Sequence, residues 1–299
     1  MSRIPERNDR KSGKKPAGAG GFKARQGGHG GGAAKGGWSP RATEPNPTAA
    51  PRSNRAKIDA DTLIWGRHPV LAALNNPARK GMGRLLATPE RAAELEREGL
   101  APGRIVEVVE PQALERMLPQ GAVHQGLVFK VQPLEGLSLE DLAEPARGVI
   151  VMLDQLTDPQ NVGAIFRSAL AFGARGIVVQ DRHSPVLAGA LAKAAAGATE
   201  RLPCARVTNL SRALERLADL GWRAVGLDGA SVETLETALD NRPTVLVMGS
   251  EGDGIRRLVA EHCDVLAKIP MPGGFESLNV SNAAAIALYE ASRKQQSLD

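Results

Sequence analysis

The chain of 299 residues is longer than one average domain and suits two modest domains with a tail. Its net charge of +5 hides an asymmetry: residues 1–57 hold 13 Lys and Arg against 3 Asp and Glu, whereas residues 58–299 hold 25 against 30. Cys204 and Cys263 are the only cysteines and belong to no CxxC or Cys/His cluster, which argues against a zinc site and a disulfide framework.

The start of the chain lacks the apolar core of a secretory signal, and no stretch is apolar for long enough to cross a bilayer. An organellar transit peptide is a rival interpretation of the basic start, but such peptides need an amphipathic apolar face that this segment lacks. We therefore expect a cytoplasmic protein without membrane contact and without a bound metal.

Residues 1–57 are rich in glycine as well as basic, with the run from Gly27 to Gly32 as the extreme case. A segment with so few apolar residues cannot bury enough surface to offset the entropy of ordering, so we predict that it is disordered. Its charge attracts polyanions because each neutralised phosphate releases counterions. The tail therefore favours nucleic acid as a partner; solubilising the chain is the alternative role.

From residue 58 onward, apolar runs and helical patterns alternate. Strands are predicted at 62–66, 84–87, 105–109 and 124–131, and helices at 68–74, 89–98 and 111–117. These elements predict a small α/β domain over residues 58–131. The segment 132–147, which contains two prolines, is predicted to be a linker.

A second domain is predicted over residues 148–299. Continuous apolar runs at 148–154, 176–180, 223–227, 244–248 and 265–269 are typical of strands buried on both faces of a sheet. Helical patterns occur at 161–172, 185–195, 210–220 and 280–294. This alternation predicts a parallel sheet with helices on both faces, so ligands are expected at the carboxyl ends of the strands.

The first of three strand-end motifs runs from Leu153 to Arg167, where a strand, a polar turn and the start of a helix follow one another. Its candidate functional residues are Asn161 and Arg167. Taken alone, these residues favour a plain alternative, in which Asn161 caps the helix and Arg167 is a surface residue that pairs with an acid.

The second motif, Val247 to Ile255, follows a buried strand with Gly249, Gly252 and Gly254. Glycines let the backbone approach a ligand closely, but a tight turn between strand and helix would use them as well. The order GxxGxG differs from the dinucleotide fingerprint GxGxxG, and no Gly-Lys-Ser/Thr is present to hold a nucleotide phosphate. This spacing weighs against a nicotinamide-dependent oxidoreductase.

The third motif, Ile269 to Glu290, leaves a strand through a Pro/Gly loop and enters an Ala-rich helix. Ser277, Asn279 and Ser281 crowd the start of that helix, and helix capping explains one or two of them. The small side chains of the helix predict close packing, and a second subunit is one candidate for its partner.

The three motifs, in this order and at strand ends, resemble those of the SpoU (TrmH-like) family of SPOUT methyltransferases. The resemblance rests on Asn161, Gly163 and Arg167 in the first motif, on Gly249, Glu251, Gly252 and Gly254 in the second, and on the strings Ile269–Met271 and Ser277–Ser281 in the third. Residues 65–74 and 124–126 resemble the ends of the L30e-like substrate-binding domain of members that modify ribosomal RNA. The resemblance covers everything except the tail.

This resemblance implies an enzyme that uses S-adenosylmethionine to methylate a ribose 2′-hydroxyl in RNA. It also implies a trefoil knot in the C-terminal part of the parallel sheet, with backbone contacts from Gly249, Ile269 and Leu278 to the adenosine portion of the donor. The branch with the greatest similarity methylates a guanosine of 23S rRNA, which we expect as the substrate. A tRNA ribose is the alternative, because the catalytic motifs are shared.

By the same resemblance, Arg167 lies at the reacting ribose, with Asn161, Glu251, Ser277 and Asn279 around it. The sulfonium methyl is already activated, whereas a ribose hydroxyl is barely ionised at neutral pH and needs alignment or proton removal. The resemblance gives Arg167 the activating role. Because a guanidinium keeps its proton below pH ~12, we expect it to bind the adjacent phosphate and to stabilise developing alkoxide charge.

An alternative from a different class is a non-catalytic RNA-binding protein that binds RNA through the small domain at residues 58–131 and through the tail. The intact Arg167 and Asn161 and the string Ser277–Asn279 argue against it.

We also expect a homodimer formed through the catalytic domain. Ala283, Ala284, Ala285 and Ala287 offer a broad surface of small residues, with Ile286 and Leu288 on its flanks. The alternative is that this helix packs only on its own sheet.

Overall fold

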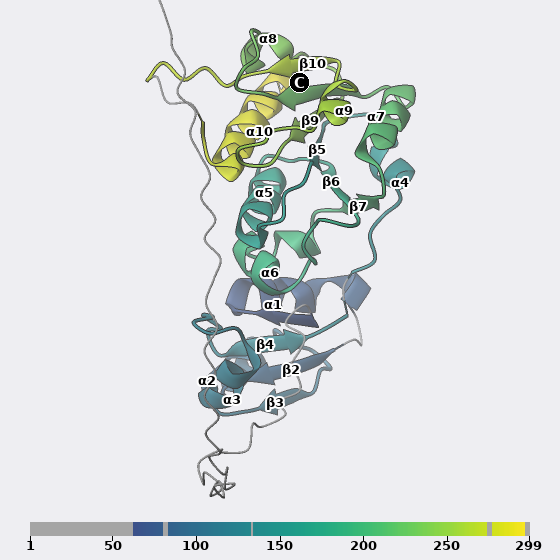
Figure 1. The fold of residues 1–299 in the computed structure, drawn as a ribbon. Helices are drawn as coiled ribbons and strands as arrows, with labels where there is room; N and C mark the ends of the chain where they lie inside the picture. Colours follow the sequence, from purple (N-terminus) through teal and green to yellow (C-terminus); the bar gives the residue numbers. More distant parts are fainter. Residues whose placement is uncertain (1–61, 80–82, 133, 274–276, 297–299) are drawn as a thin grey trace, which may run out of the picture. The chain divides into compact units, whose positions relative to one another are not determined.

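The computed structural model describes residues 62–79, 83–132, 134–273 and 277–296. The tail that we predict to be disordered, residues 1–57, lies outside these ranges. Two β-sheets, one of four and one of six strands, organise the described residues (Figure 1). Helices pack on both faces of each sheet. The predicted α/β fold class is confirmed; the trefoil knot stays a prediction.

The smaller sheet has the strand order β1-β4-β2-β3. Its strands are β1 (Leu63–Trp65), β2 (Arg84–Ala87), β3 (Val106–Val108) and β4 (Leu127–Lys130). The β2–β3 pair is parallel, and β4 is antiparallel to both β1 and β2. Because side chains alternate along a strand, Ile64 packs with α1 (Arg67–Asn75) and α2 (Pro89–Arg97), whereas Trp65 packs with α3 (Pro111–Met117).

The larger sheet is entirely parallel, with the order β10-β8-β9-β5-β6-β7. Its strands are β5 (Val149–Leu153), β6 (Gly176–Gln180), β7 (Cys204–Val207), β8 (Arg223–Leu227), β9 (Thr244–Met248) and β10 (Val265–Ala267). Every residue of the central strands β5 and β9 is buried, as expected for strands covered on both faces.

Two layers of helices cover this sheet (Figure 1). One layer contains α5 (Pro159–Ala171), α6 (Gly189–Ala195), α8 (Leu235–Ala238) and α10 (Val280–Gln296); the other contains α4 (Leu139–Ala143), α7 (Leu210–Asp219) and α9 (Arg257–Ala260). In the first layer α5 and α6 pack unusually closely, because a Cβ on Gly163 would lie only 2.6 Å from the Cβ of Ala194. Gly163, the glycine of the first motif, therefore allows the two helices to pack closely.

The structure adds elements that the hydrophobic pattern does not predict. Strand β7 is a short edge strand, and α4 lies within the segment 132–147 that we predict to be a linker. Leu142 of α4 is buried in the core beneath α7, so this segment packs on the larger sheet. Helix α6 begins at Gly189, four residues later than predicted.

The region between the two sheets is also packed. Ala192 of α6 is buried in the core of the smaller sheet, beside Val70 and Ala73 of α1. Next to it, Arg79 at the end of a short 3-10 helix (Pro77–Arg79) forms a buried ion pair with Glu200, which ends a second 3-10 helix (Ala198–Glu200). These contacts join residues more than 110 positions apart in the sequence.

Two general features of the described residues bear on function. None of their helices is long and apolar enough to cross a membrane. Within the same ranges, no group of three or more His, Cys, Asp or Glu side chains is arranged to hold a metal ion.

Candidate active site

A cavity of about 520 Å³ lies at the carboxyl ends of β8, β9 and β10. This volume falls within the range of about 300–1,000 Å³ that is typical of small-molecule and cofactor sites. The loops that follow the three strands line it, together with the start of α10. The lining includes the three residues predicted to contact the methyl donor, Gly249, Ile269 and Leu278, and two of the predicted catalytic residues, Glu251 and Ser277.

The loop after β9 turns back sharply on itself. Ser250 and Gly254 exchange two backbone hydrogen bonds, with N–O distances of 3.0 and 3.1 Å. Gly254 has a φ of +67°, and a Cβ on Gly249 would lie 2.0 Å from the carbonyl carbon of Gly254. The turn therefore requires glycine at both positions, and it presents bare backbone to the cavity.

The end of this loop is held by Asp154, which directly follows β5. The Asp154 carboxylate is fully buried and accepts hydrogen bonds from the backbone N–H of Arg256 at 2.9 Å and from Arg256 Nε at 2.8 Å. The Arg256 guanidinium also donates to Gln180 Oε1, at 3.0 Å, at the end of β6. This partly buried ion pair anchors the loop after β9 to the sheet, so the protein itself sets the conformation of the loop.

Asn161, Glu251 and Asn279, one residue from each motif, meet in a hydrogen-bonded cluster. Glu251 Oε1 accepts from Asn161 Nδ2 at 3.1 Å, from Asn279 Nδ2 at 2.7 Å and from the backbone N–H of Val280 at 3.2 Å. Asn279 Nδ2 also donates to Asn161 Oδ1 at 3.0 Å. The fold thus brings three predicted catalytic residues together beside the cavity, although they span 118 positions of sequence.

The helix caps determine which polar side chains are available to this cluster. Asp158 caps α5, because its carboxylate accepts from the backbone N–H groups of Gln160 and Asn161. The alternative that Asn161 is the cap is therefore wrong, and its carboxamide can reach Glu251. Asn279 does cap α10, because its Oδ1 accepts from the N–H of Ser281 at 3.0 Å, while its Nδ2 belongs to the cluster.

Two predicted catalytic residues lie outside this cluster. Arg167 is exposed on α5 and is not part of the cavity lining. Within the described ranges its guanidinium makes no hydrogen bond or ion pair. The alternative that Arg167 is a surface arginine paired with an acid therefore has no supporting contact among the described residues. Ser277 is exposed and lines the cavity.

The cavity also contains Asp228 and Lys268, which the sequence analysis does not single out. Asp228 directly follows β8 and Lys268 directly follows β10, so the rule that ligands bind at the carboxyl ends of strands points to both. Asp228 Oδ1 accepts from the backbone N–H of Ala230 at 2.9 Å, which holds its carboxylate in the turn. Together with Glu251 and Asp253, it gives the lining an excess of carboxylates over the single Lys268.

The central position of Glu251 leads to a prediction. Replacing Glu251 by alanine removes the shared acceptor of three N–H groups, so we expect the start of α10 and the side chain of Asn161 to lose their alignment. Because small misplacements of reacting groups are costly, enzymatic activity should fall about 100-fold. The matched control is Glu236→Ala, since Glu236 is an exposed glutamate on α8; an equal loss in both variants would contradict the assignment.

The fold and the cavity define a parallel α/β protein with a small-molecule site at the carboxyl ends of its strands, attached to a smaller α/β domain. Comparison with known families identifies both parts. The model of the SpoU rRNA Methylase family matches residues 148–289, and a model described as RNA 2′-O ribose methyltransferase substrate binding matches residues 63–137.

Relatives and solved structures agree with these matches. An uncharacterized tRNA/rRNA methyltransferase of Mycolicibacterium smegmatis is 39% identical over 86% of this chain and 85% of its own length. The SpoU methyltransferase AviRb of Streptomyces viridochromogenes, in complex with the cofactor AdoMet, has a TM-score of 0.66 at 28% identity and covers 79% of this chain and 90% of its own. An AdoMet-bound rRNA methyltransferase of Sinorhizobium meliloti has a TM-score of 0.63 at 26% identity, covering 78% and 87%.

The chain belongs to the SpoU rRNA methylase family. This confirms the prediction, made from the three motifs, of an S-adenosylmethionine-dependent RNA methyltransferase.

Proposed function

We propose that this RNA methyltransferase modifies a ribose 2′-hydroxyl of a guanosine in 23S rRNA. The observation that carries the proposal is the cluster of Asn161, Glu251 and Asn279 beside the cavity, because it brings together polar side chains that the 2′-O-methyltransferase resemblance places around the reacting ribose. The match of residues 63–137 to a substrate-binding model of RNA 2′-O ribose methyltransferases supports ribose as the acceptor.

The cavity fits S-adenosylmethionine in both size and charge. Its carboxylates, including that of Asp228, favour a ligand that carries a sulfonium and an ammonium group. The backbone of Gly249, Ile269 and Leu278 would contact the adenosine portion of this donor. The bound donor supplies an activated methyl group, and the remaining chemistry concerns the acceptor.

Methyl transfer forms a bond between the methyl carbon and the ribose O2′, breaks the bond between carbon and sulfur so that the donor leaves as a neutral thioether, and releases the hydroxyl proton to water. In our proposal Arg167 binds the phosphate next to the reacting ribose and stabilises the charge that develops on O2′. Asn161, Asn279 and Ser277 orient the ribose, and Glu251 holds the two asparagines in place. A protonated guanidinium cannot accept the proton, so Arg167 acts through its charge.

The test of the proposed function maps 2′-O-methyl groups in total RNA from cells with and without the gene. The expected result is the loss of one 2′-O-methylguanosine in 23S rRNA. Loss of a methyl group from tRNA instead would favour the main alternative substrate. If no ribose methylation changes, and calorimetry detects no binding of S-adenosylmethionine, the non-catalytic RNA-binding alternative holds.

The proposal includes a homodimer formed through α10, but the structure changes which residues of that helix are available. Ala284, Ala287 and Leu288 are buried in the core of their own domain. Ile286 and Tyr289 are 41% and 51% exposed, and they lie three positions apart on the outer side of α10. The available surface is therefore this pair of larger side chains rather than the alanine face as a whole.

We expect the wild-type protein to sediment as a dimer of about 63 kDa, twice the chain mass of 31.5 kDa. Ile286→Asp should shift it to the monomer at micromolar concentration and lower its activity, because a buried carboxylate without a partner disfavours the interface. Ile105→Asp is the matched control, since Ile105 is an exposed isoleucine of the smaller domain. A fully active wild-type monomer would refute the dimer and its contribution to the site.

A further inference from the structure

A turn of the smaller domain meets a helix of the larger one at Gln125. The residue has a left-handed backbone, with φ of +55°, and is followed by Gly126 with φ of +78°. A left-handed conformation is unfavourable for glutamine, and such strain is found most often at functional positions. The strained backbone directs the Gln125 side chain to a site where Oε1 accepts two hydrogen bonds, from the backbone N–H of Arg67 at 3.0 Å and from Lys193 Nζ at 3.1 Å.

Lys193 belongs to α6 of the larger domain, and its ammonium lies over Gly66. A Cβ on Gly66 would approach Lys193 Nζ to 2.4 Å, so the absence of a side chain at this position makes room for the cation. Lys193 is half-buried, and burial lowers the pKa of its ammonium group. Among the described residues the ammonium group of Lys193 donates only to the neutral Gln125, and no carboxylate pairs with it.

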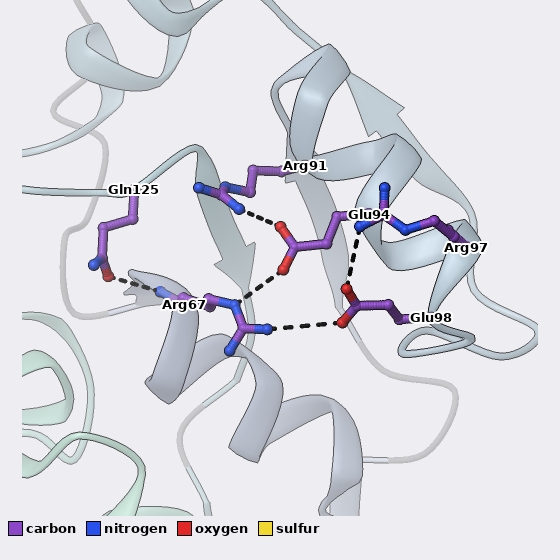
Figure 2. A network of polar contacts seen from close by, with 6 residues as sticks. All are labelled: Arg67, Arg91, Glu94, Arg97, Glu98 and Gln125. Carbon is purple, nitrogen blue, oxygen red and sulfur yellow. Dashed lines mark hydrogen bonds and ion pairs between the residues drawn. The ribbon is translucent and has the colours of Figure 1, made fainter.

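Two acids near Arg67, Glu94 and Glu98, are engaged by arginines (Figure 2). Glu94 accepts from Arg67 Nε at 3.0 Å and also pairs with Arg91. Glu98 contacts Arg67 at 3.8 Å and Arg97 at 3.2 Å. These pairs keep Arg67 directed toward α2. No ion pair among the described residues compensates the positive charge of Lys193, which is partly desolvated.

A partly buried cation without an acid partner is costly for the folded protein unless an external anion neutralises it. Two protons of the ammonium group and the carboxamide NH₂ of Gln125 have no acceptor among the described residues. They form a small set of N–H donors that matches the oxygens of a phosphate group.

We propose that Lys193 and Gln125 bind a backbone phosphate of the RNA where it crosses from the substrate-binding domain to the catalytic domain. This inference rests on the proposed function. Helix α6, which carries Lys193, packs directly against Gly163 of α5, and α5 also carries Asn161 and Arg167. A strand of RNA held at this junction would therefore lie alongside the helix that carries two of the proposed catalytic residues.

The test compares Lys193→Gln with the wild-type chain, using transcribed 23S rRNA and an unrelated transcript of equal length. Loss of one phosphate contact should weaken the binding of both RNAs about 5- to 10-fold and reduce the slope of log K against log salt by about 0.7–0.9. The affinity for S-adenosylmethionine should not change. The melting temperature should stay the same or rise, because the variant removes an uncompensated charge.

Arg212→Gln is the control for the loss of one positive charge, since Arg212 is exposed on α7 in the opposite helix layer. Lys193→Arg should recover most of the salt slope because it restores the charge. Unchanged RNA affinity and slope in Lys193→Gln would overturn the proposal, as would a fall in melting temperature without an effect on RNA. These outcomes are distinct from failure of the proposed function, in which the wild-type enzyme methylates no RNA.

Discussion

Replacing Arg167 by alanine is expected to abolish methyl transfer while leaving the affinity for S-adenosylmethionine within a few fold. The side chain is exposed on α5, outside the lining of the cavity, and no acid among the described residues neutralises it. Its charge is therefore available to the RNA phosphate and to the developing alkoxide. Removing one such stabilising group in other enzymes lowers the rate by about 10²–10³-fold, and the loss of phosphate binding adds to this.

On the same preparation, single-turnover kinetics measure the rate of methyl transfer and calorimetry measures the affinity for S-adenosylmethionine. Arg167→Lys should restore little of the methyl-transfer activity, because an ammonium group cannot reproduce the bidentate contact of a guanidinium with a phosphate. Arg212→Ala provides the matched control on α7. If Arg167→Ala lost donor binding and turnover to the same extent, Arg167 would belong to the donor cavity instead.

Glu200→Ala is expected to have the largest effect on stability. Glu200 and Arg79 are only 1% and 2% exposed, and they form two hydrogen bonds, from Arg79 Nε at 2.7 Å and from Nη2 at 3.0 Å. Arg79 Nη1 also donates to the carbonyl of Gln132 at 2.7 Å, and Asn76 Nδ2 donates to Glu200 at 2.8 Å. Removing the carboxylate leaves a buried guanidinium charge without a counterion, which costs about 3–5 kcal/mol in the free energy of unfolding.

Denaturant unfolding measures this effect, and an exposed pair on the same chain provides the control. Arg257 of α9 and Glu261, which directly follows this helix, are 78% and 50% exposed, so Glu261→Ala should cost less than about 1 kcal/mol. A double replacement of Arg79 by methionine and Glu200 by leucine should be less destabilising than Glu200→Ala, because no buried charge remains. Equal costs for Glu200→Ala and Glu261→Ala would contradict the burial argument.

The Arg79–Glu200 pair also fixes the substrate-binding domain to the catalytic domain. It lies at the same boundary as the contact between Gln125 and Lys193, and Ala192 is buried in the core of the smaller sheet nearby. This boundary between the two domains is therefore both packed and hydrogen-bonded within the described chain.

The local pattern of the sequence was sufficient for most elements of the fold. Strands β5, β6, β8 and β9 coincide with continuous apolar runs, because a strand covered on both faces has apolar residues at every position. The turns after β5, β9 and β10 carry the motif residues, and parallel strands bring their carboxyl ends to one edge. The hydrophobic pattern therefore determined the fold class, and the resemblance of the motifs indicated the family and the three residues Gly249, Ile269 and Leu278, which line the cavity.

Only the tertiary structure decided which side chains meet. The sequence does not reveal that Asp158 caps α5 and leaves Asn161 to Glu251, or that the outer side of α10 is Ile286 and Tyr289 rather than the alanine face. Edge strand β7 and helix α4 are too short to show a clear period, and packing against the larger sheet stabilises them. The Arg79–Glu200 and Lys193–Gln125 contacts join residues that are 121 and 68 positions apart in the sequence. The packing of distant segments selects such partners, and this packing leaves no periodic signal in the sequence.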